Sequence, residues 1–297
     1  MPDIILQYEP WLRLGAFAAV LAGMASWEAL APRRQRAVSR WARWPSNLGI
    51  VVLNTALMRA LVPVAAVGIA ALGEERGWGL LNNMALPGWI GLLAAIVLLD
   101  LAIYLQHALF HAVPALWRLH RMHHADLDFD VTTGARFHPL EILISTGIKL
   151  GVVAAIGAPA VAVVMFEIVL NATAMFNHGN VGLPPALDRV LRWIVVTPDM
   201  HRVHHSVVPS ETNSNFGFNL PWWDRLFGTY RAAPAAGHEG MTIGLDDFRD
   251  PSQLRLDRML VQPFVGSPGP YPLDSRPSPM RRSALPNVNT EAGKLRR

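Results

Sequence analysis

Residues 101–124 read LAIYLQHALFHAVPALWRLHRMHH, an apolar segment that passes directly into a cluster of histidines. The apolar part belongs to a longer segment, residues 88–106, which is long enough to cross the hydrocarbon layer of a membrane. Imidazole is a common metal ligand in proteins. We therefore expect the functional part of the chain to begin where this segment leaves the membrane.

The composition of the 297-residue chain is typical of an integral membrane protein. Hydrophobic residues make up 52% of it and charged residues only 16%, which is a poor fit to a soluble globule. The absence of cysteine excludes a disulfide scaffold, a cysteine-ligated zinc site, an iron–sulfur cluster and a thiolate nucleophile. The formal net charge of +4 is small and no basic stripe alternates with aromatic residues, so we expect no nucleic-acid partner.

Other apolar segments predict an all-α fold, a polytopic bundle of membrane helices. The first expected span covers residues 11–30. The second covers residues 48–72 and contains Arg59 and Pro63, so we expect a kinked helix whose arginine faces protein rather than lipid. A further block, residues 140–176, contains a Gly-Ala-Pro turn signal near its middle and predicts a helical hairpin, which either crosses the membrane or only dips into it.

Loop charges predict the orientation of the bundle. Short loops rich in Lys and Arg stay on the cytoplasmic side of a membrane. The loop after the first expected span carries five arginines, which are Arg33, Arg34, Arg36, Arg40 and Arg43. With a hairpin that returns to the side it entered from, every histidine cluster is expected on the cytoplasmic face.

The chain divides into three expected parts. Residues 1–99 are N-terminal transmembrane helices, residues 100–230 form the histidine-bearing catalytic region, and residues 231–297 form a polar, Pro-rich tail. Apolar periodicity stops after residue 230, and Pro, Ser, Gly and Arg dominate from Pro263 onward. We expect the tail to be largely disordered, and the part from Pro263 onward to be removable with little loss.

Eight of the eleven histidines fall into three spaced clusters, HALFH, HRMHH and HRVHH. On a helix, positions i, i+3 and i+4 share a face, so each HxxHH is expected to present three imidazoles to one point. Imidazole suits iron, copper, zinc or nickel, and one ion rarely takes more than three or four such ligands. We therefore expect two metal ions, held by catalytic residues His107, His111, His120, His123, His124, His201, His204 and His205.

Three histidines lie outside these clusters. His138 and His178 stand at the two ends of the expected hairpin, which would bring both to the metal site as further ligands. His138 precedes Pro139 and has the alternative of bonding a backbone group or a carboxylate. His238 lies in the polar tail and is expected to be exposed and uninvolved.

Carboxylates within the apolar segments are expensive in a membrane and usually functional. Asp100 stands seven positions before His107 on nearly the same helix face. Two interpretations are open: Asp100 orients His107 through an intermediate group or water, or it forms an ion pair with Arg59. Glu141 and Glu167 leave the same two interpretations open.

The order and spacing of these motifs resemble the fatty acid hydroxylase and sterol desaturase superfamily. The resemblance covers roughly residues 100–230 and includes RFHPLE, NHGN and the stretch TNSNFGFNLPWWDRLFGTY, where Trp223, Asp224, Phe227, Gly228 and Thr229 match the family pattern. It implies an integral membrane oxygenase with a histidine-rich di-iron centre, in which zinc is a substitute metal. The implied ligands are the eight clustered histidines and His178, with His138 as a weaker addition.

The resemblance also implies a reaction. Family members hydroxylate or desaturate hydrocarbon portions of lipids, such as sterols or fatty acyl chains, with O2 and electrons from a separate NAD(P)H-linked donor: a reductase, ferredoxin or cytochrome. An unactivated C–H bond needs a redox-active metal, which zinc is not. The alternatives are a dizinc hydrolase acting on a lipid ester or phosphate and a metal transport or storage protein. The Ala-, Arg- and Pro-rich composition suggests a bacterial inner membrane.

Overall fold

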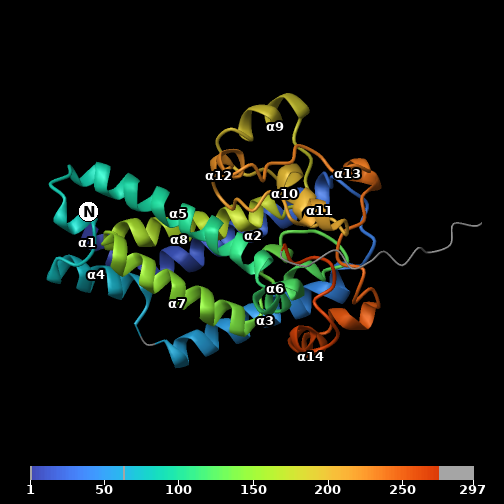
Figure 1. The fold of residues 1–297 in the computed structure, drawn as a ribbon, viewed down its shortest axis with the longest axis horizontal. Coiled ribbons are helices and arrows are strands. Elements are labelled where there is room, and N and C mark those ends of the chain that lie inside the picture. Colours follow the sequence, from blue (N-terminus) through green and yellow to red (C-terminus); the bar gives the residue numbers. More distant parts are fainter. Residues whose placement is uncertain (1, 63, 274–297) are drawn as a thin grey trace, which may run out of the picture.

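The computed structural model describes residues 2–62 and 64–273, and these residues form helices, turns and loops without a β-strand. Long helices run side by side in an elongated bundle, and the shorter helices gather at one end of it (Figure 1). The predicted all-α fold is confirmed. The long helices and their short neighbours are α1 (Pro2–Gln7), α2 (Glu9–Leu30), α3 (Arg40–Leu61), α4 (Ala66–Arg76), α5 (Gly88–Ala112), α7 (Pro139–Ile156) and α8 (Ala160–Asn177).

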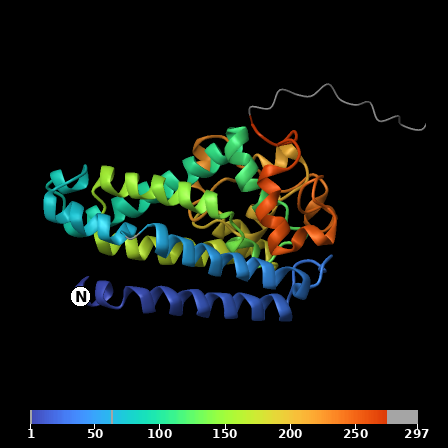
Figure 2. The same ribbon diagram turned by 90° about the horizontal axis from the view of Figure 1, so that it is seen from below.

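Four segments of the described chain are long and apolar enough to cross a membrane, and the protein is therefore a membrane protein. They are Arg40–Asn83, which contains α3 and α4, and the helices Gly88–Ala112, Pro139–Ile156 and Ala160–Asn177. Helix α2, the first expected span, lies along one face of the bundle against α8 (Figure 2). It is helical as expected but falls outside these four segments, since Arg13 and Glu28 interrupt its apolar run.

The second expected span, residues 48–72, differs from its prediction in its bounds and in being divided into two helices. Helix α3 begins at Arg40 and ends at Leu61, and α4 begins only at Ala66, so two helices replace one kinked helix. Arg59 is exposed, and the expectation that it faces protein is wrong. The buried positions of α3 recur every three or four residues along one stripe, and Arg59 lies off that stripe; they are Arg43, Asn47, Ile50 and Asn54.

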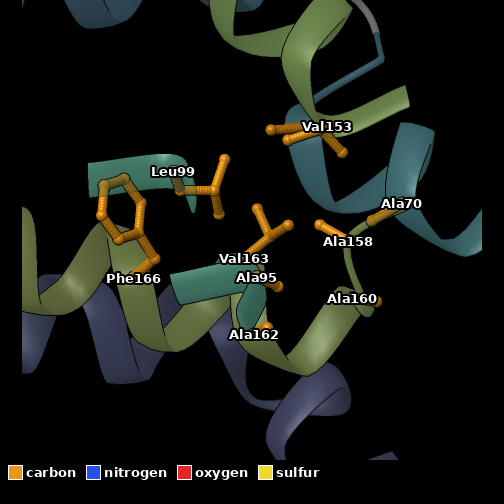
Figure 3. Close-up of a cluster of buried hydrophobic side chains, with 10 residues drawn as sticks. Ala70, Ala95, Leu99, Val153, Ala158, Ala160, Ala162, Val163 and Phe166 are labelled. Atoms are coloured by element: carbon orange, nitrogen blue, oxygen red, sulfur yellow. The ribbon is translucent and has the colours of Figure 1, made fainter. Parts of the chain in front are cut away.

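The expected hairpin is present as α7 and α8, joined at Gly157. This glycine has a positive φ of 66°, and a Cβ there would approach the Trp78 carbonyl oxygen to 2.5 Å, so the turn requires glycine. Beside the turn, small residues let α4, α5, α7 and α8 approach closely around larger ones such as Leu99 and Phe166 (Figure 3). This apolar core stabilises the end of the bundle that is opposite the histidines.

Short helices form a cap at the other end of the bundle (Figure 1). They follow the C-terminal ends of α5 and α8, and several begin with proline at the first helical position, where its missing N–H costs nothing. They are α6 (Pro114–His124), α9 (Pro185–Leu191), α10 (Pro198–His204), α11 (Pro209–Thr212), α12 (Trp222–Leu226), α13 (Gly237–Gly240) and α14 (Leu256–Val261), with 3₁₀ turns at Thr133–Ala135, Pro251–Leu254 and Gln262–Phe264. A further 3₁₀ turn, Leu81–Asn83, lies at the opposite end of the bundle, beside the α7–α8 turn.

A buried ion network ties α3 to the cap. Arg43 is fully buried; its Nε and Nη1 donate to Asp126 Oδ1 and Asp130 Oδ2, 2.7 and 2.6 Å away. The Arg43 guanidinium holds the pKa of Asp126 far below its usual range, against the effect of burial. The network therefore fixes the loop that directly follows the second histidine cluster.

The C-terminal segment is structured as far as residue 273, so the expectation of disorder is wrong for residues 231–273, while the expectation that the part from Pro263 onward is removable stays a prediction. Trp117 Nε1 of α6 donates to the Pro268 carbonyl at 3.0 Å, and Arg118 donates to the Pro263 carbonyl at 3.0 Å. Tyr271 is buried and stacks on Trp117. These bonds use backbone carbonyls, which leave no periodic signal in a sequence. Residues 274–297 lie outside the described residues.

We expect Arg43→Ala to lower the free energy of unfolding by about 3–5 kcal/mol, because it leaves two buried carboxylates without their partner. Thermal unfolding of the purified protein in nanodiscs measures this change. Arg255→Ala, at an exposed pair with Asp257, should leave the unfolding temperature unchanged. Equal effects of the two substitutions would contradict the assigned role of the network.

We expect Tyr271→Ala to destabilise the protein by about 3 kcal/mol through the loss of a buried ring. Phe264→Ala, at an exposed ring of the same segment, should have little effect in the same thermal assay. Ending the chain at Gln262 should be at least as damaging as Tyr271→Ala. A truncated chain with the unfolding temperature of the full chain would instead bear out the expectation that this part is removable.

Candidate metal centre

Nine buried histidines converge where α5, α6, α8 and α10 meet. They form two groups, within each of which the candidate ligand nitrogens lie within 4.8 Å of one another. The first group contains His107, His111, His120, His124 and His204. The second group contains His123, His178, His201 and His205.

Each HxxHH motif contributes to both groups. On α6, His120 and His124 belong to the first group and His123 to the second. In the motif at the end of α10 the assignment is reversed: His201 and His205 belong to the second group, and His204 belongs to the first. The expectation that each motif presents three imidazoles to one point is therefore wrong. Positions i and i+4 diverge by about 40° around a helix but i+3 and i+4 by about 100°, so the motif lies between two sites.

Backbone carbonyls fix the tautomer of four of these imidazoles. The Nδ1 of His107 lies 2.7 Å from the Phe216 carbonyl oxygen, and that of His178 lies 2.7 Å from the Ala174 carbonyl oxygen. His204 and His123 make the same contact with carbonyls, at 2.8 and 3.2 Å. A carbonyl only accepts, so Nδ1 carries the proton and Nε2 carries the free lone pair.

The Nε2 atoms of the second group point at one another. His178 Nε2 lies 3.2 Å from His123 Nε2, 3.1 Å from His201 Nε2 and 3.2 Å from His205 Nε2. In the first group, His107 Nε2 and His120 Nε2 are 3.2 Å apart. Where both nitrogens carry lone pairs, no hydrogen bond joins them. A cation bound between them satisfies all of them at once, so the donor set fits a metal ion in each group.

Further imidazole nitrogens have no hydrogen-bond partner in the described part of the chain. Leaving such a buried polar atom unpaired costs roughly 1–3 kcal/mol, and metal coordination removes the cost for those that face the centre. These atoms are His111 Nε2, both ring nitrogens of His124, His201 Nδ1, His204 Nε2 and His205 Nδ1. The unpaired nitrogens are a second, independent observation that fits metal binding.

Burial keeps five of the clustered imidazoles neutral. It lowers the pKa well below the usual histidine value, and the neighbouring imidazoles, which would repel a further positive charge, lower it more; this holds for His123, His124, His201, His204 and His205. Only the neutral imidazole has a lone pair to give to a metal. These five imidazoles are therefore able to bind a metal ion at neutral pH.

Two side-chain acceptors orient further ligands. Glu141 Oε1 lies 2.6 Å from His120 Nδ1, so of the two open interpretations the orienting one holds for Glu141. Asn213 Oδ1 lies 3.1 Å from His111 Nδ1. Sequence reasoning did not single out Asn213, although it lies in the Asn-rich stretch that carries part of the family resemblance.

The other two membrane carboxylates do not contact the histidines. Glu167 makes an ion pair with Arg13 at 2.9 Å and another with Lys149, which is the structural interpretation. Asp100 contacts neither His107 nor Arg59 directly: its Oδ2 accepts from Trp223 Nε1 at 2.7 Å and from Leu220 N at 3.3 Å. It therefore anchors a loop of the cap to α5.

Two of the remaining sequence candidates lie outside both groups. His138 caps the N-terminus of α7: its Nδ1 accepts from Leu140 N at 3.2 Å and its Nε2 lies 3.3 Å from the Leu260 carbonyl oxygen. Its position favours the backbone-bonding alternative over the ligand role. His238 is partly buried, 3.7 Å from Asp199, so the expectation that it is exposed is wrong.

Aromatic rings line the centre. Phe137 stacks on His123 with ring centroids 4.5 Å apart, and Phe216 meets the rings of the first group edge-on. Trp117 packs against the ring of His111 at 4.8 Å. The arrangement is a pair of buried nitrogen donor sets beside aromatic rings, a set that suits iron, copper, zinc or nickel.

Comparison with known proteins agrees with this geometry. Residues 92–229, which include all nine clustered histidines, match the fatty acid hydroxylase family model. The chain is 32% identical over 139 residues to ornithine lipid hydroxylase OlsE of Rhizobium tropici, covering 47% of this chain and 41% of that protein.

Two further relatives are more distant. Alkylglycerol monooxygenase of Xenopus tropicalis is 26% identical over 236 residues, covering 75% of this chain and 50% of that protein. Cholesterol 25-hydroxylase of Rattus norvegicus is 26% identical over 145 residues, covering 48% and 47%. The aligned regions thus span half or less of these relatives' own lengths. No solved structure matches the chain.

We expect His124→Ala and His201→Ala, one from each group, each to remove about one metal ion per chain, because each lowers the number of nitrogen donors at a single site. Elemental analysis of the purified, dialysed protein measures the loss. His238→Ala should retain the full metal content. If both cluster variants also retained it, the two groups would not be metal sites.

Proposed function

We propose that the protein is a di-iron oxygenase of the fatty acid hydroxylase family that oxidises C–H bonds of a membrane lipid with O2; residues 92–229 match the model of that family. One observation carries the proposal: two adjacent sets of buried imidazoles whose lone pairs converge. Bound iron would supply the one-electron chemistry that reduces O2 with external electrons. The relatives are named as hydroxylases or monooxygenases of lipids, which favours hydroxylation over desaturation.

The chain's own residues would bind the metal ions, orient the imidazoles and limit the access of bulk water to the site. The nine clustered histidines are the proposed ligands, and backbone carbonyls hold four of them in one tautomer. Glu141 accepts a hydrogen bond from Nδ1 of His120, and this bond raises the basicity of Nε2 of His120. Phe137, Phe216 and Trp117 keep bulk water away from the site where a reactive oxidant would otherwise be quenched.

Two other functions fit less well. A dizinc hydrolase needs a metal-bound water as its nucleophile, and the aromatic wall opposes free access of water. A metal transporter needs ligands along a path through the membrane. The histidines of α5 lie in its last two turns, and the other three candidate spans contain no histidine.

The arginine-rich loop supports a cytoplasmic position for the centre. Arg33 Nε lies 3.5 Å from Asp199 Oδ2 of α10, and Arg43 contacts Asp126, so the loop lies at the histidine end of the bundle. By the charge bias of short loops, this end faces the cytoplasm, and we assign the protein to a bacterial inner membrane. Electrons come from a separate NAD(P)H-linked protein that meets the centre on this side.

The test is oxygen-isotope incorporation. The full chain in nanodiscs, loaded with ferrous iron and given NADPH, a ferredoxin and its reductase, should add one ¹⁸O atom from ¹⁸O2 to a lipid in a panel of acyl lipids, ether lipids and sterols. Mass spectrometry of the extracted lipids detects the product. Zinc-loaded protein and the His124→Ala variant should give no product, because neither holds two redox-active metal ions. Lipid hydrolysis without O2, or equal product from the zinc form, would overturn the proposal.

A further inference from the structure

Two short helices of the cap carry an exposed apolar surface that the metal centre does not use. Its members come from α9, from α12 and from the residues that follow each helix, and each is at least 46% exposed. We call it the α9–α12 surface. It contains Leu187, Val190, Trp193, Ile194, Trp222, Leu226 and Phe227.

Specific contacts join the two helices into one surface. Trp222 Nε1 donates to the Trp193 carbonyl oxygen at 2.7 Å. The Arg225 guanidinium lies 3.9 Å from the centre of the Trp193 ring and 4.0 Å from that of Tyr230. Arg225 also donates to the Arg192 carbonyl at 3.0 Å. The apolar side chains are therefore presented on a fixed frame.

Contacts with α5 place this surface at the level of the membrane. Trp223 of α12 donates to Asp100, and Phe227 stacks on Tyr104 with ring centroids 5.4 Å apart. Both partners lie inside the candidate span Gly88–Ala112. Tyr104 lies about 24 Å along α5 from its first residue, against a hydrocarbon thickness of roughly 30 Å. Helix α12 thus lies beside the span near one edge of the hydrocarbon layer.

The composition of the surface matches that edge. Tryptophan and arginine are enriched where hydrocarbon meets headgroups. Arg189 is exposed and forms no ion pair with a carboxylate in residues 2–62 or 64–273, so it is free to meet phosphate, whereas Arg225 is held by the two rings and the Arg192 carbonyl. We propose that the α9–α12 surface is inserted into the leaflet on the histidine side, with its rings in the hydrocarbon and Arg189 on anionic headgroups.

This insertion brings lipid close to the metal centre. Phe227 stacks on Tyr104, Tyr104 meets Phe216 edge-on at 6.3 Å, and Phe216 meets His107 at 5.6 Å. Two rings thus separate the inserted surface from the first histidine group. The inference stands on contacts with a span and does not depend on the reaction that the centre performs.

The absence of cysteine in the chain makes single-cysteine labelling direct. Val190→Cys and Leu226→Cys carry a nitroxide label on the metal-free full chain in nanodiscs. Leu93→Cys, exposed on α5, is the lipid reference, and Ser252→Cys, exposed on the C-terminal segment, is the water reference. The ratio of O2 to water-soluble nickel-chelate collisions should be several-fold higher at positions 190 and 226 than at position 252, and close to that at position 93.

The proposed contact between Arg189 and anionic headgroups is tested by a second measurement. The collision ratio at position 190 should be higher in phosphatidylglycerol discs than in phosphatidylcholine discs, and Arg189→Gln should reduce that difference. Chelate access at positions 190 and 226 equal to that at position 252 would overturn the proposal. So would protection from both reagents that grows with protein concentration, which would mean that a second copy covers the surface. Because no activity is measured, either result is independent of the oxygenase proposal.

Discussion

The hydrogen bonds from imidazole Nδ1 to backbone carbonyls are the contacts on which the rest of the centre depends. They leave Nε2 as the only free donor of each ring, and so decide where the lone pairs converge. The Ala174 carbonyl belongs to α8, but the other three carbonyls belong to loops, which other residues must hold in place. Arg43 holds the loop that ends at Arg136, and Asp224 holds the one that contains Phe216, accepting from the backbone nitrogens of Phe216 and Gly217 at 2.8 and 2.9 Å. Two buried acidic contacts in the cap thus set the geometry of the ligands.

The two histidine groups are mechanically linked because α6 and α10 serve both. A rotation of α6 that improved the fit of His120 and His124 in the first group would carry His123 out of the second. The same holds for α10 with the roles exchanged. In the proposed di-iron centre, the i, i+3, i+4 spacing therefore keeps the two ions close together and at a fixed separation, as a reaction shared between two metals requires.

The sequence predicts the parts of the molecule whose signal is local. Apolar length and a glycine turn indicate the α7–α8 hairpin, histidine spacing indicates eight of the clustered histidines, and the end of the hairpin indicates His178. The sequence does not predict the division of these histidines into two groups, which depends on helix phase at one meeting point, and it leaves His138 open between a ligand role and backbone bonding. The fold of residues 231–273 was missed because carbonyls of a Pro- and Gly-rich segment carry it. The prediction that Arg59 faces protein was wrong because only one stripe of α3 is buried and Arg59 lies off that stripe.

Asp100 gives the clearest link between the membrane and the centre. A carboxylate inside a span is costly unless it is bonded, and here its partners are Trp223 and the backbone nitrogen of Leu220, both from the cap. Satisfying Asp100 therefore draws the loop of residues 216–224 down against α5. The same loop presents the Phe216 carbonyl to His107 and carries α12 to the hydrocarbon edge. The depth of the first histidine group in the bilayer is thus coupled, through one buried carboxylate, to the orientation of a proposed ligand.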